Sequence, residues 1–326
     1  MKNYFLILFT STLCLTFGQE YEAKIFEHQG DALPYRILLP KNFNPQNTYP
    51  LLLVLHGAGE RGNDNQSQLV HGSYLFQSEQ FRAKYPAIVV FPQCPKDSYW
   101  SSVEKDYETS LAKKYTYSKS LPNNPQLEIV EALMVFLEKN YRIDATRRYV
   151  GGLSMGGMGT FELVSRNPDY FAAAFPICGG ANPNWAPLLQ KTPLWIFHGE
   201  QDNVVWVEHS KKMYRALKKI NAPVKLTLYP EVNHDSWHNA FADPDLMQWL
   251  FSNQKNSLGD PRRTMIVVRL IRSLFVSGSF PNSFAVDVID ITRCHIDFTQ
   301  AFFFELPSQT FRLFPGIGYS KIYMFF

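Results

Sequence analysis

A five-residue string, Gly152-Leu153-Ser154-Met155-Gly156, constrains the fold of this chain more than any other part of its sequence. It follows a strand-like run at 148–151 and precedes a helix-like run at 157–166. Glycines on both sides of the serine allow a strand and a helix to pass closely at a sharp turn, from which the hydroxyl projects. This context predicts a nucleophile elbow at Ser154. The alternative is a small serine that only packs the turn.

Apolar runs alternate with helix-like segments through most of the chain. Helical spacing of apolar residues is found at 125–141, and further helices are expected at 207–220 and 240–251. Continuous apolar runs are typical of parallel strands that are covered on both faces. The expected strands lie at 21–26, 35–39, 50–55, 87–91, 148–151, 172–177, 193–197 and 225–229. The alternation predicts an α/β fold with a mostly parallel, doubly wound sheet and helices on both faces.

Two further polar residues follow expected strands. Asp202 comes after the run at 193–197, and His234 comes after the run at 225–229. Loops at the carboxyl ends of such strands meet at one edge, so we expect these side chains to reach Ser154. His234 would accept the serine proton, and Asp202 would hold the ring in the correct tautomer. The order nucleophile, acid, histidine is that of the α/β-hydrolase fold.

Each of these assignments has a rival nearby. His238 is expected to begin the last helix, which favours His234 as the base. Glu200 competes with Asp202 but follows the strand end too closely. Asp235 is expected to turn the loop or cap the helix.

The strand at 50–55 ends in a loop of small residues, 56–62. Such a loop can turn a backbone N–H toward a substrate oxygen. We expect the N–H groups of Ala58 and Met155 to form an oxyanion hole.

Aromatic residues are frequent in the loops expected at the catalytic edge. Trp100 and Trp237 are predicted to form a platform for a sugar or phenolic group, and half-buried loop anchors are the alternative. The segment 94–124 is long for a connection, so it is interpreted as a wall or small lid of the site, or as a solvated insertion.

Composition excludes several other classes of protein. The net charge of +3 gives no strong field that would attract nucleic acid or an anionic surface. No zinc-type Cys/His spacing, phosphate loop or dinucleotide fingerprint is present in the sequence, so no metal and no cofactor are predicted. His56 and His198 each precede a glycine at a strand end, where histidine is expected to pack beneath the loops.

The two ends of the chain differ from its middle. Lys2 precedes a largely apolar run, 4–17, and then Gly18, which predicts a signal peptide at 1–18 and a secreted or periplasmic protein with no stable membrane span. The alternative is a membrane anchor. Cleavage there would leave Cys94, Cys178 and Cys294, for which unpaired thiols are favoured over one bridge.

Beyond residue 255 lysine becomes rare and phenylalanine frequent. Three interpretations compete for 256–326: a poorly ordered extension, a sorting or anchoring appendage, and a non-native reading frame. We expect the functional domain to be 19–255.

Five motifs resemble those of the bacterial "predicted peptidase" esterases in the α/β-hydrolase superfamily, which are similar to the dienelactone-hydrolase, prolyl-oligopeptidase and polyhydroxybutyrate-depolymerase-like groups. The motifs are HGAGERG at 56–62, FPQCP at 91–95, GLSMGG at 152–157, HGEQD at 198–202 and VNHDSW at 232–237. The resemblance covers about 21–255. It implies carboxylester hydrolysis, including that of acetyl or feruloyl groups on plant polysaccharides. It also implies Ser154 as nucleophile, Asp202 as acid, His234 as base, and Ala58 and Met155 as oxyanion donors.

The sequence therefore predicts a secreted serine carboxylesterase that forms an acyl-enzyme without a metal. One alternative is a peptidase of prolyl-oligopeptidase type, which would normally carry a propeller domain that the short N-terminal region has no room for. The other is a silent binding protein on a hydrolase scaffold, against which the complete Ser–Asp–His set argues.

Overall fold

The computed structural model describes residues 20–111, 114–255, 304–306 and 309–311. The chain divides into two units, Met1–Asn253 and Gln254–Phe326. In the second unit the described residues are 254–255 and two short antiparallel strands, β11 (Phe304–Leu306) and β12 (Gln309–Phe311). The signal peptide expected at 1–18 and nearly all of the extension expected at 256–326 lie outside the described residues.

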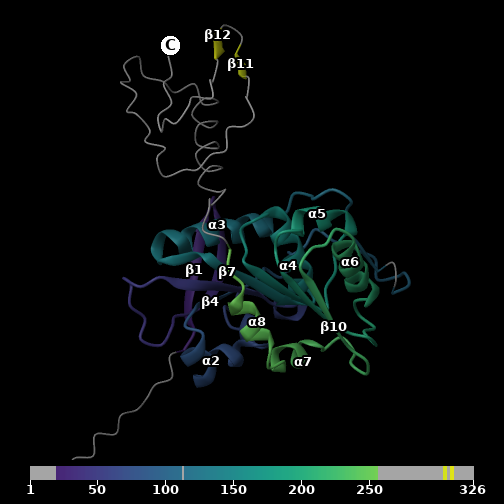
Figure 1. Cartoon of the computed structure of the whole chain (residues 1–326), viewed down its shortest axis with the longest axis horizontal. Helices are drawn as coiled ribbons and strands as arrows, with labels where there is room; N and C mark the ends of the chain where they lie inside the picture. Colours follow the sequence, from purple (N-terminus) through teal and green to yellow (C-terminus); the bar gives the residue numbers. More distant parts are fainter. Residues whose placement is uncertain (1–19, 112–113, 256–303, 307–308, 312–326) are drawn as a thin grey trace, which may run out of the picture. The chain divides into compact units, whose positions relative to one another are not determined.

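An eight-stranded sheet forms the centre of the first unit, in the order β1-β2-β4-β3-β7-β8-β9-β10 (Figure 1). Its strands are β1 (Glu22–His28), β2 (Asp31–Leu38), β3 (Tyr49–Leu55), β4 (Ile88–Pro92), β7 (Ile143–Leu153), β8 (Ala173–Ile177), β9 (Leu194–Gly199) and β10 (Val224–Tyr229). The pairs β1–β2 and β2–β4 are antiparallel, and all other neighbours in the sheet are parallel. The expected mostly parallel sheet is thereby confirmed.

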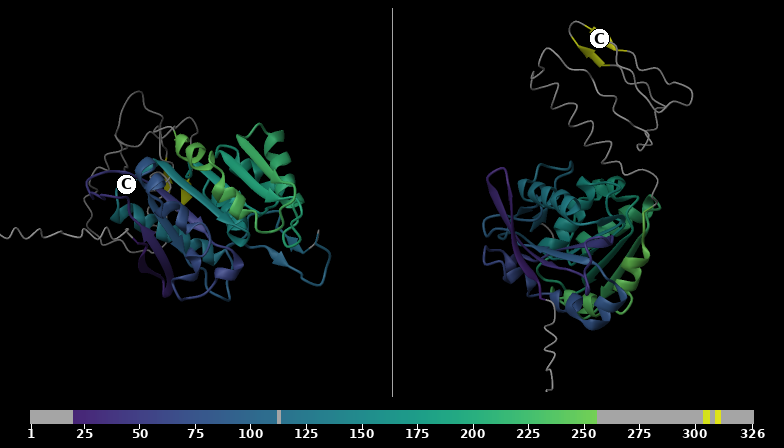
Figure 2. Two further views of the ribbon diagram at one scale, coloured as in Figure 1. Left: turned by 90° about the horizontal axis from the view of Figure 1, so that it is seen from below. Right: turned by 90° about the vertical axis from the view of Figure 1, so that its left-hand side faces the viewer.

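Helices cover both faces of this sheet, as Figure 2 shows. The helices are α1 (Ser73–Gln77), α2 (Glu79–Lys84), α3 (Pro125–Asn140), α4 (Met155–Arg166), α5 (Ala186–Leu189), α6 (Glu208–Lys219), α7 (Trp237–Ala242) and α8 (Leu246–Ser252). One apolar core contains residues of α3 to α6, such as Leu133 and Phe161, and the other contains residues of α1, α2, α7 and α8, such as Phe76 and Phe241. The two cores bury both faces of β3, β4, β8 and β9, which explains why these strands are almost continuously apolar, whereas the edge strand β10 is only half-buried.

The last helix differs from the expectation. A single helix at 240–251 is wrong, because the structure has two short helices, α7 and α8, separated by the sequence Asp243-Pro244-Asp245. Proline lacks an N–H and disfavours helical backbone in the residue before it. Asp243 is accordingly extended, with φ −64° and ψ 117°.

The long segment between β4 and α3 contains a small hairpin of β5 (Glu104–Lys105) and β6 (Tyr115–Thr116), which projects from the body of the unit (Figure 2, left view). The buried carboxylate of Glu162 on α4 anchors the segment, because it accepts hydrogen bonds from Ser101, Ser102 and Asn124. Its tyrosines 115 and 117 pack with Met158 and Val205 in a third apolar cluster. The segment therefore packs against α4 and the loop after β9 rather than forming a solvated insertion.

Candidate active site

Ser154 lies between β7 and α4 in a backbone conformation that side chains rarely adopt, with φ +53°. The turn is possible because Gly152 and Gly156 lie against the end of β3. A Cβ atom on Gly152 would come within 2.6 Å of the Leu55 carbonyl oxygen, and one on Gly156 within 2.0 Å of the same atom. The two glycines therefore allow the close approach that turns the Ser154 hydroxyl out of the sheet.

The side chains of Ser154, His234 and Asp202 form a continuous hydrogen-bonded chain. Ser154 Oγ lies 2.8 Å from His234 Nε2, and His234 Nδ1 lies 2.7 Å from Asp202 Oδ2. Asp202 accepts only, so Nδ1 carries the proton and Nε2 faces the serine hydroxyl as an acceptor. This arrangement fits a general base beside a nucleophile, with a carboxylate that orients the base.

Backbone contacts tie the loop of Asp202 to the loop of His234. The N–H of Gln201 donates to the carbonyl of Val232 at 3.1 Å, and the N–H of Asn203 donates to Asn233 Oδ1 at 3.0 Å. Gly199 permits this contact, since a Cβ there would meet the Asn233 carbonyl oxygen at 2.2 Å. The two loops are thus held together by their own polar groups.

The carboxylate of Asp202 is buried and fully engaged. Its Oδ1 accepts from the N–H groups of Val204 and Val205 at 2.8 and 2.9 Å. Burial by itself would raise the pKa of Asp202, but hydrogen bonds and positive charge from His198 and His234 hold that pKa below its ordinary value. Asp202 is therefore ionised at neutral pH.

The two expected oxyanion donors follow β3 and β7, which are neighbouring strands of the sheet. Met155 is the first residue of α4, so its N–H has no partner within the helix. Ala58 begins a short 3₁₀ turn, Ala58–Glu60, directly after β3. Gly57 brings the two loops together, since a Cβ on it would meet the Leu153 side chain at 2.8 Å. Both N–H groups therefore come from loops that meet beside Ser154.

The rival residues make other contacts. His238 is exposed on α7 and its ring lies against His71 and Trp237. Glu200 pairs with Lys211 at 3.6 Å. Asp235 is exposed, and its carbonyl accepts from the N–H of His238.

The two candidate aromatic contacts differ in exposure. Trp100 has 0% exposure and packs edge-on against His56 at 5.3 Å, so it cannot offer a ring to a substrate, and its assignment to a platform is corrected. Trp237 is half-buried and packs edge-on against His234 at 5.5 Å. A substrate bound at Ser154 could reach Trp237 alone of the two.

His56 and His198 are both buried beneath the loops. His56 Nδ1 lies 2.6 Å from the Gly57 carbonyl, and Nε2 accepts from the N–H of Cys94 at 2.9 Å. Burial lowers the pKa of His56 to about 4, which keeps Nε2 available as that acceptor. His198 has a further contact that its sequence position did not reveal, since its Nε2 lies 3.1 Å from Asp202 Oδ2.

The donor atoms of Cys178, Asp202 and His234 lie within 4.8 Å of one another, a spacing that could hold a metal ion and is unique among the residues that the structure describes. The Asp202–His234 hydrogen bond already joins two of them. Burial raises the pKa of the Cys178 thiol, whereas metals bind thiolate. We therefore interpret Asp202 and His234 as a hydrogen-bonded pair rather than as ligands of a metal ion. Cys94 and Cys178 are both free and buried.

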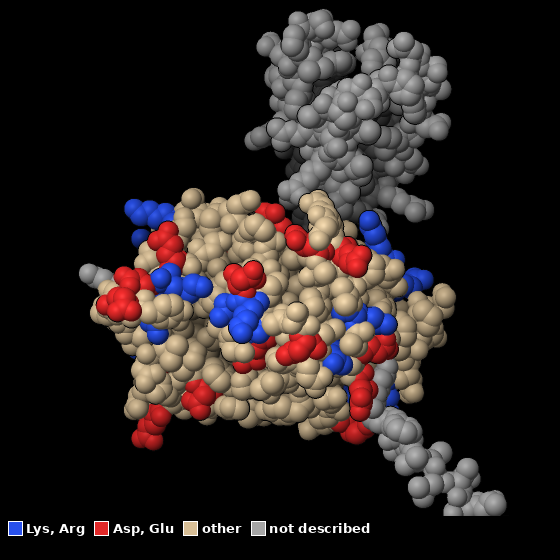
Figure 3. Space-filling view, turned by 180° about the vertical axis from the view of Figure 1, so that it is seen from behind, with Lys and Arg blue, Asp and Glu red and all other residues tan. Residues whose placement is uncertain are grey.

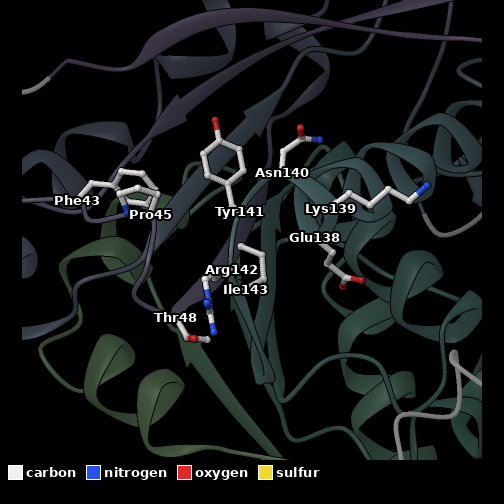
Figure 4. Close-up of a pocket in the computed structure, with 9 residues that line it drawn as sticks. All are labelled: Phe43, Pro45, Thr48, Glu138, Lys139, Asn140, Tyr141, Arg142 and Ile143. Atoms are coloured by element: carbon white, nitrogen blue, oxygen red, sulfur yellow. The ribbon is translucent and has the colours of Figure 1, made fainter.

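A pocket of about 330 Å³ lies elsewhere on the first unit (Figure 4). It is lined by Phe43, Pro45 and Thr48 before β3, and by the residues from Glu138 at the end of α3 to Ile143 at the start of β7. These residues are at the N-terminal ends of the parallel strands, whereas Ser154 is at a C-terminal end. This pocket is separate from the candidate active site.

The surface shows no single-sign field on the face in Figure 3, where acidic and basic side chains are interspersed. No helix in the described ranges has the length and apolar character needed to cross a bilayer.

Comparison with known proteins gives a consistent result. Residues 28–236 match the family model described as "Putative esterase". A bifunctional acetylxylan esterase/xylanase of Neocallimastix patriciarum is 30% identical over 191 residues, which are 57% of this chain and 24% of that protein.

Solved structures are similar as well. The crystal structure of a thermostable esterase is 34% identical, with a TM-score of 0.66 over 73% of this chain and 64% of that one. A ferulic acid esterase at 17% identity and a TM-score of 0.53, over 72% of this chain and 98% of its own, shows a shared fold. The chain thus spans about a quarter of the acetylxylan esterase/xylanase and under two thirds of the thermostable esterase.

Proposed function

The chain belongs to the esterase family whose model matches residues 28–236, and we propose that it is a serine carboxylesterase that works through an acyl-enzyme intermediate. One observation carries the proposal. The Ser154 hydroxyl, the His234 ring and the Asp202 carboxylate form a hydrogen-bonded chain at 2.8 and 2.7 Å. In this arrangement the unprotonated Nε2 of His234 faces the Ser154 hydroxyl and can accept its proton.

The first half of the reaction forms the acyl-enzyme. Ser154 Oγ attacks the ester carbonyl carbon while His234 Nε2 takes the hydroxyl proton. The tetrahedral oxyanion is held by the N–H groups of Met155 and Ala58, and each such donor contributes about 3 kcal/mol to transition-state stabilisation. The C–O bond to the alcohol then breaks, and the protonated His234 gives its proton to the leaving oxygen.

The second half releases the acid. Water attacks the acyl carbon as His234 takes its proton, and the Ser154 oxygen leaves with that proton restored. Asp202 stays ionised throughout and stabilises the imidazolium that forms in each half.

We assign the substrates to acetyl or feruloyl esters of plant polysaccharides. Two observations support this: a relative named as an acetylxylan esterase/xylanase, and the half-buried Trp237 ring beside His234, which could stack on a sugar or a phenolic group. Trp100 is buried and takes no part.

An ester panel tests this function. Purified protein is assayed on p-nitrophenyl acetate, acetylated and feruloylated xylan fragments, and blocked peptides. We expect turnover of the esters, with the highest kcat/KM on xylan-linked esters. Activity on peptides alone would overturn the proposal.

The same proposal places the catalytic domain at 19–255 and assigns 1–18 to a signal peptide for secretion or export to a periplasm. Truncation after Lys255 should leave soluble, active enzyme. Loss of activity on truncation would show that the domain extends further.

A further inference from the structure

We propose that His198 is a positioning residue for this reaction: it lies beside Asp202 as a buried imidazolium and thereby sets how strongly Asp202 attracts the proton of His234. This inference rests on the proposed function in one respect, that His234 acts as the base. The geometry of His198 itself stands apart from any activity.

His198 is fully buried at the end of β9, and both of its ring nitrogens have partners. Nε2 lies 2.9 Å from the Val205 carbonyl oxygen and 3.1 Å from Asp202 Oδ2. Nδ1 lies 2.8 Å from Ser210 Oγ on α6. Ser210 Oγ in turn donates to the Gly179 carbonyl at 2.9 Å.

These partners fix the protons on the ring. A carbonyl and a carboxylate only accept, so Nε2 must carry a proton. Ser210 has one hydroxyl proton and gives it to the Gly179 carbonyl, so its oxygen accepts from Nδ1. Both nitrogens of His198 are then protonated, and the ring carries a positive charge.

A buried positive charge needs a partner, and Asp202 is in place to be one. Its Oδ2 is shared between His198 Nε2 at 3.1 Å and His234 Nδ1 at 2.7 Å. The charge of His198 offsets part of the charge of Asp202. His234 is therefore less basic than it would be beside a carboxylate with no such neighbour. It stays neutral, as a base must be, down to a lower pH.

The other buried titratable groups around this pair are neutral near pH 7. Burial raises the pKa of the Cys178 thiol and that of the Tyr115 phenol, both of which face Asp202. Burial lowers the pKa of His209, which faces His198 from α6, to about 4. Asp235 is exposed to solvent. Among the described residues, His198 is thus the buried group, apart from His234, whose positive charge lies against Asp202.

NMR of the full-length protein tests this directly, because it needs no turnover. Nitrogen-15 shifts of the His198 ring should show both nitrogens protonated at pH 7. The ring of His234 is then titrated in wild type, in His198→Gln and in His209→Gln. His198→Gln keeps a side chain that can donate to Asp202 but removes the charge, and His209→Gln is the matched control for loss of a buried histidine.

We expect the His234 titration to move up by about 1 pH unit in His198→Gln and to stay in place in His209→Gln. The acid limb of kcat/KM on p-nitrophenyl acetate should move by the same amount. If His198→Gln does not fold, Ser210→Ala replaces it, with a smaller upward shift expected because Nδ1–H loses its acceptor.

A neutral His198 ring, or an unchanged His234 titration in a folded variant, would overturn the inference. Failure of the wild type to hydrolyse any ester would instead remove the proposed function, and the NMR titration would still decide the role of His198.

Discussion

Asp202 Oδ2 lies 2.7 Å from His234 Nδ1, while Asp202 Oδ1 accepts two backbone N–H groups. The carboxylate therefore cannot rotate away from the ring without losing three hydrogen bonds. Its place fixes the tautomer of His234 and so leaves Nε2 free to face Ser154.

Asp202→Asn should reduce kcat by roughly 10⁴-fold with little change in fold, because an amide can donate to Nδ1 and so stabilise the wrong tautomer. The measurement is kcat on p-nitrophenyl acetate, with circular dichroism to check folding. Asp235→Asn is the matched control and should keep most activity. Equal losses of kcat in both variants would contradict the assignment of Asp202 as the residue that orients His234.

Two histidines four residues apart offer a second test. His234→Ala should reduce kcat by roughly 10⁴-fold or more, since Ser154 loses its base. His238→Ala should retain most activity, because that exposed ring contacts His71 and Trp237 instead. A dead His238→Ala beside an active His234→Ala would reverse the assignment of the base.

Much of this site could be predicted because its residues follow parallel strands that runs of apolar residues mark in the sequence. Ser154, Asp202 and His234 each follow such a strand, and parallel strands bring their carboxyl ends to one edge. The sequence could not place Trp100, since a tryptophan in a long loop can be a contact or an anchor. Its burial depends on Gly159, which lets its side chain pack against α4.

The contact of His198 with Asp202 could not be predicted from the sequence for a related reason. A histidine before a glycine at a strand end is expected to pack, and His198 does pack, with no exposed surface. Its approach to Asp202 depends on how the loop after β9 turns back. That turn is set by the backbone contacts of Gln201 and Asn203 with the loop of His234, which no local pattern reveals.

The two tryptophans should respond differently to truncation. Trp100→Ala should lower the free energy of unfolding by about 3–5 kcal/mol, as for a buried aromatic. Trp237→Ala should change stability less and raise KM on a feruloylated xylan fragment by roughly 3- to 10-fold. Denaturant unfolding and steady-state kinetics measure the two effects. Comparable KM changes in both variants would contradict the difference in exposure.

Acid should destabilise the fold through His56. The pKa of His56 is about 4 in the folded chain against an ordinary value of 6.5, so the unfolded chain takes up this proton first as pH falls. The contribution of His56 to the free energy of unfolding is fully present above about pH 6.5. It falls by about 3 kcal/mol as the pH drops from there to 4.

Thermal melts at pH 7 and pH 4.5 check this dependence. His56→Gln should melt lower at pH 7 but lose less on acidification than the wild type, whereas His28→Asn on β1 should behave as the wild type does. An unchanged acid dependence in His56→Gln would show that other groups cause it.

Covalent labelling is the most direct test of whether Ser154 is the nucleophile. The protein is treated with a serine-directed phosphonate, and the site and stoichiometry of labelling are read by mass spectrometry. Ser154→Ala is treated alongside, with Ser118→Ala as the control, because Ser118 is an exposed serine in the segment between β4 and α3. We expect one label per chain on Ser154, complete loss of ester turnover with labelling, no label in Ser154→Ala, and normal labelling in Ser118→Ala. Ester turnover that survives in Ser154→Ala, or a label on another residue, would contradict the claim.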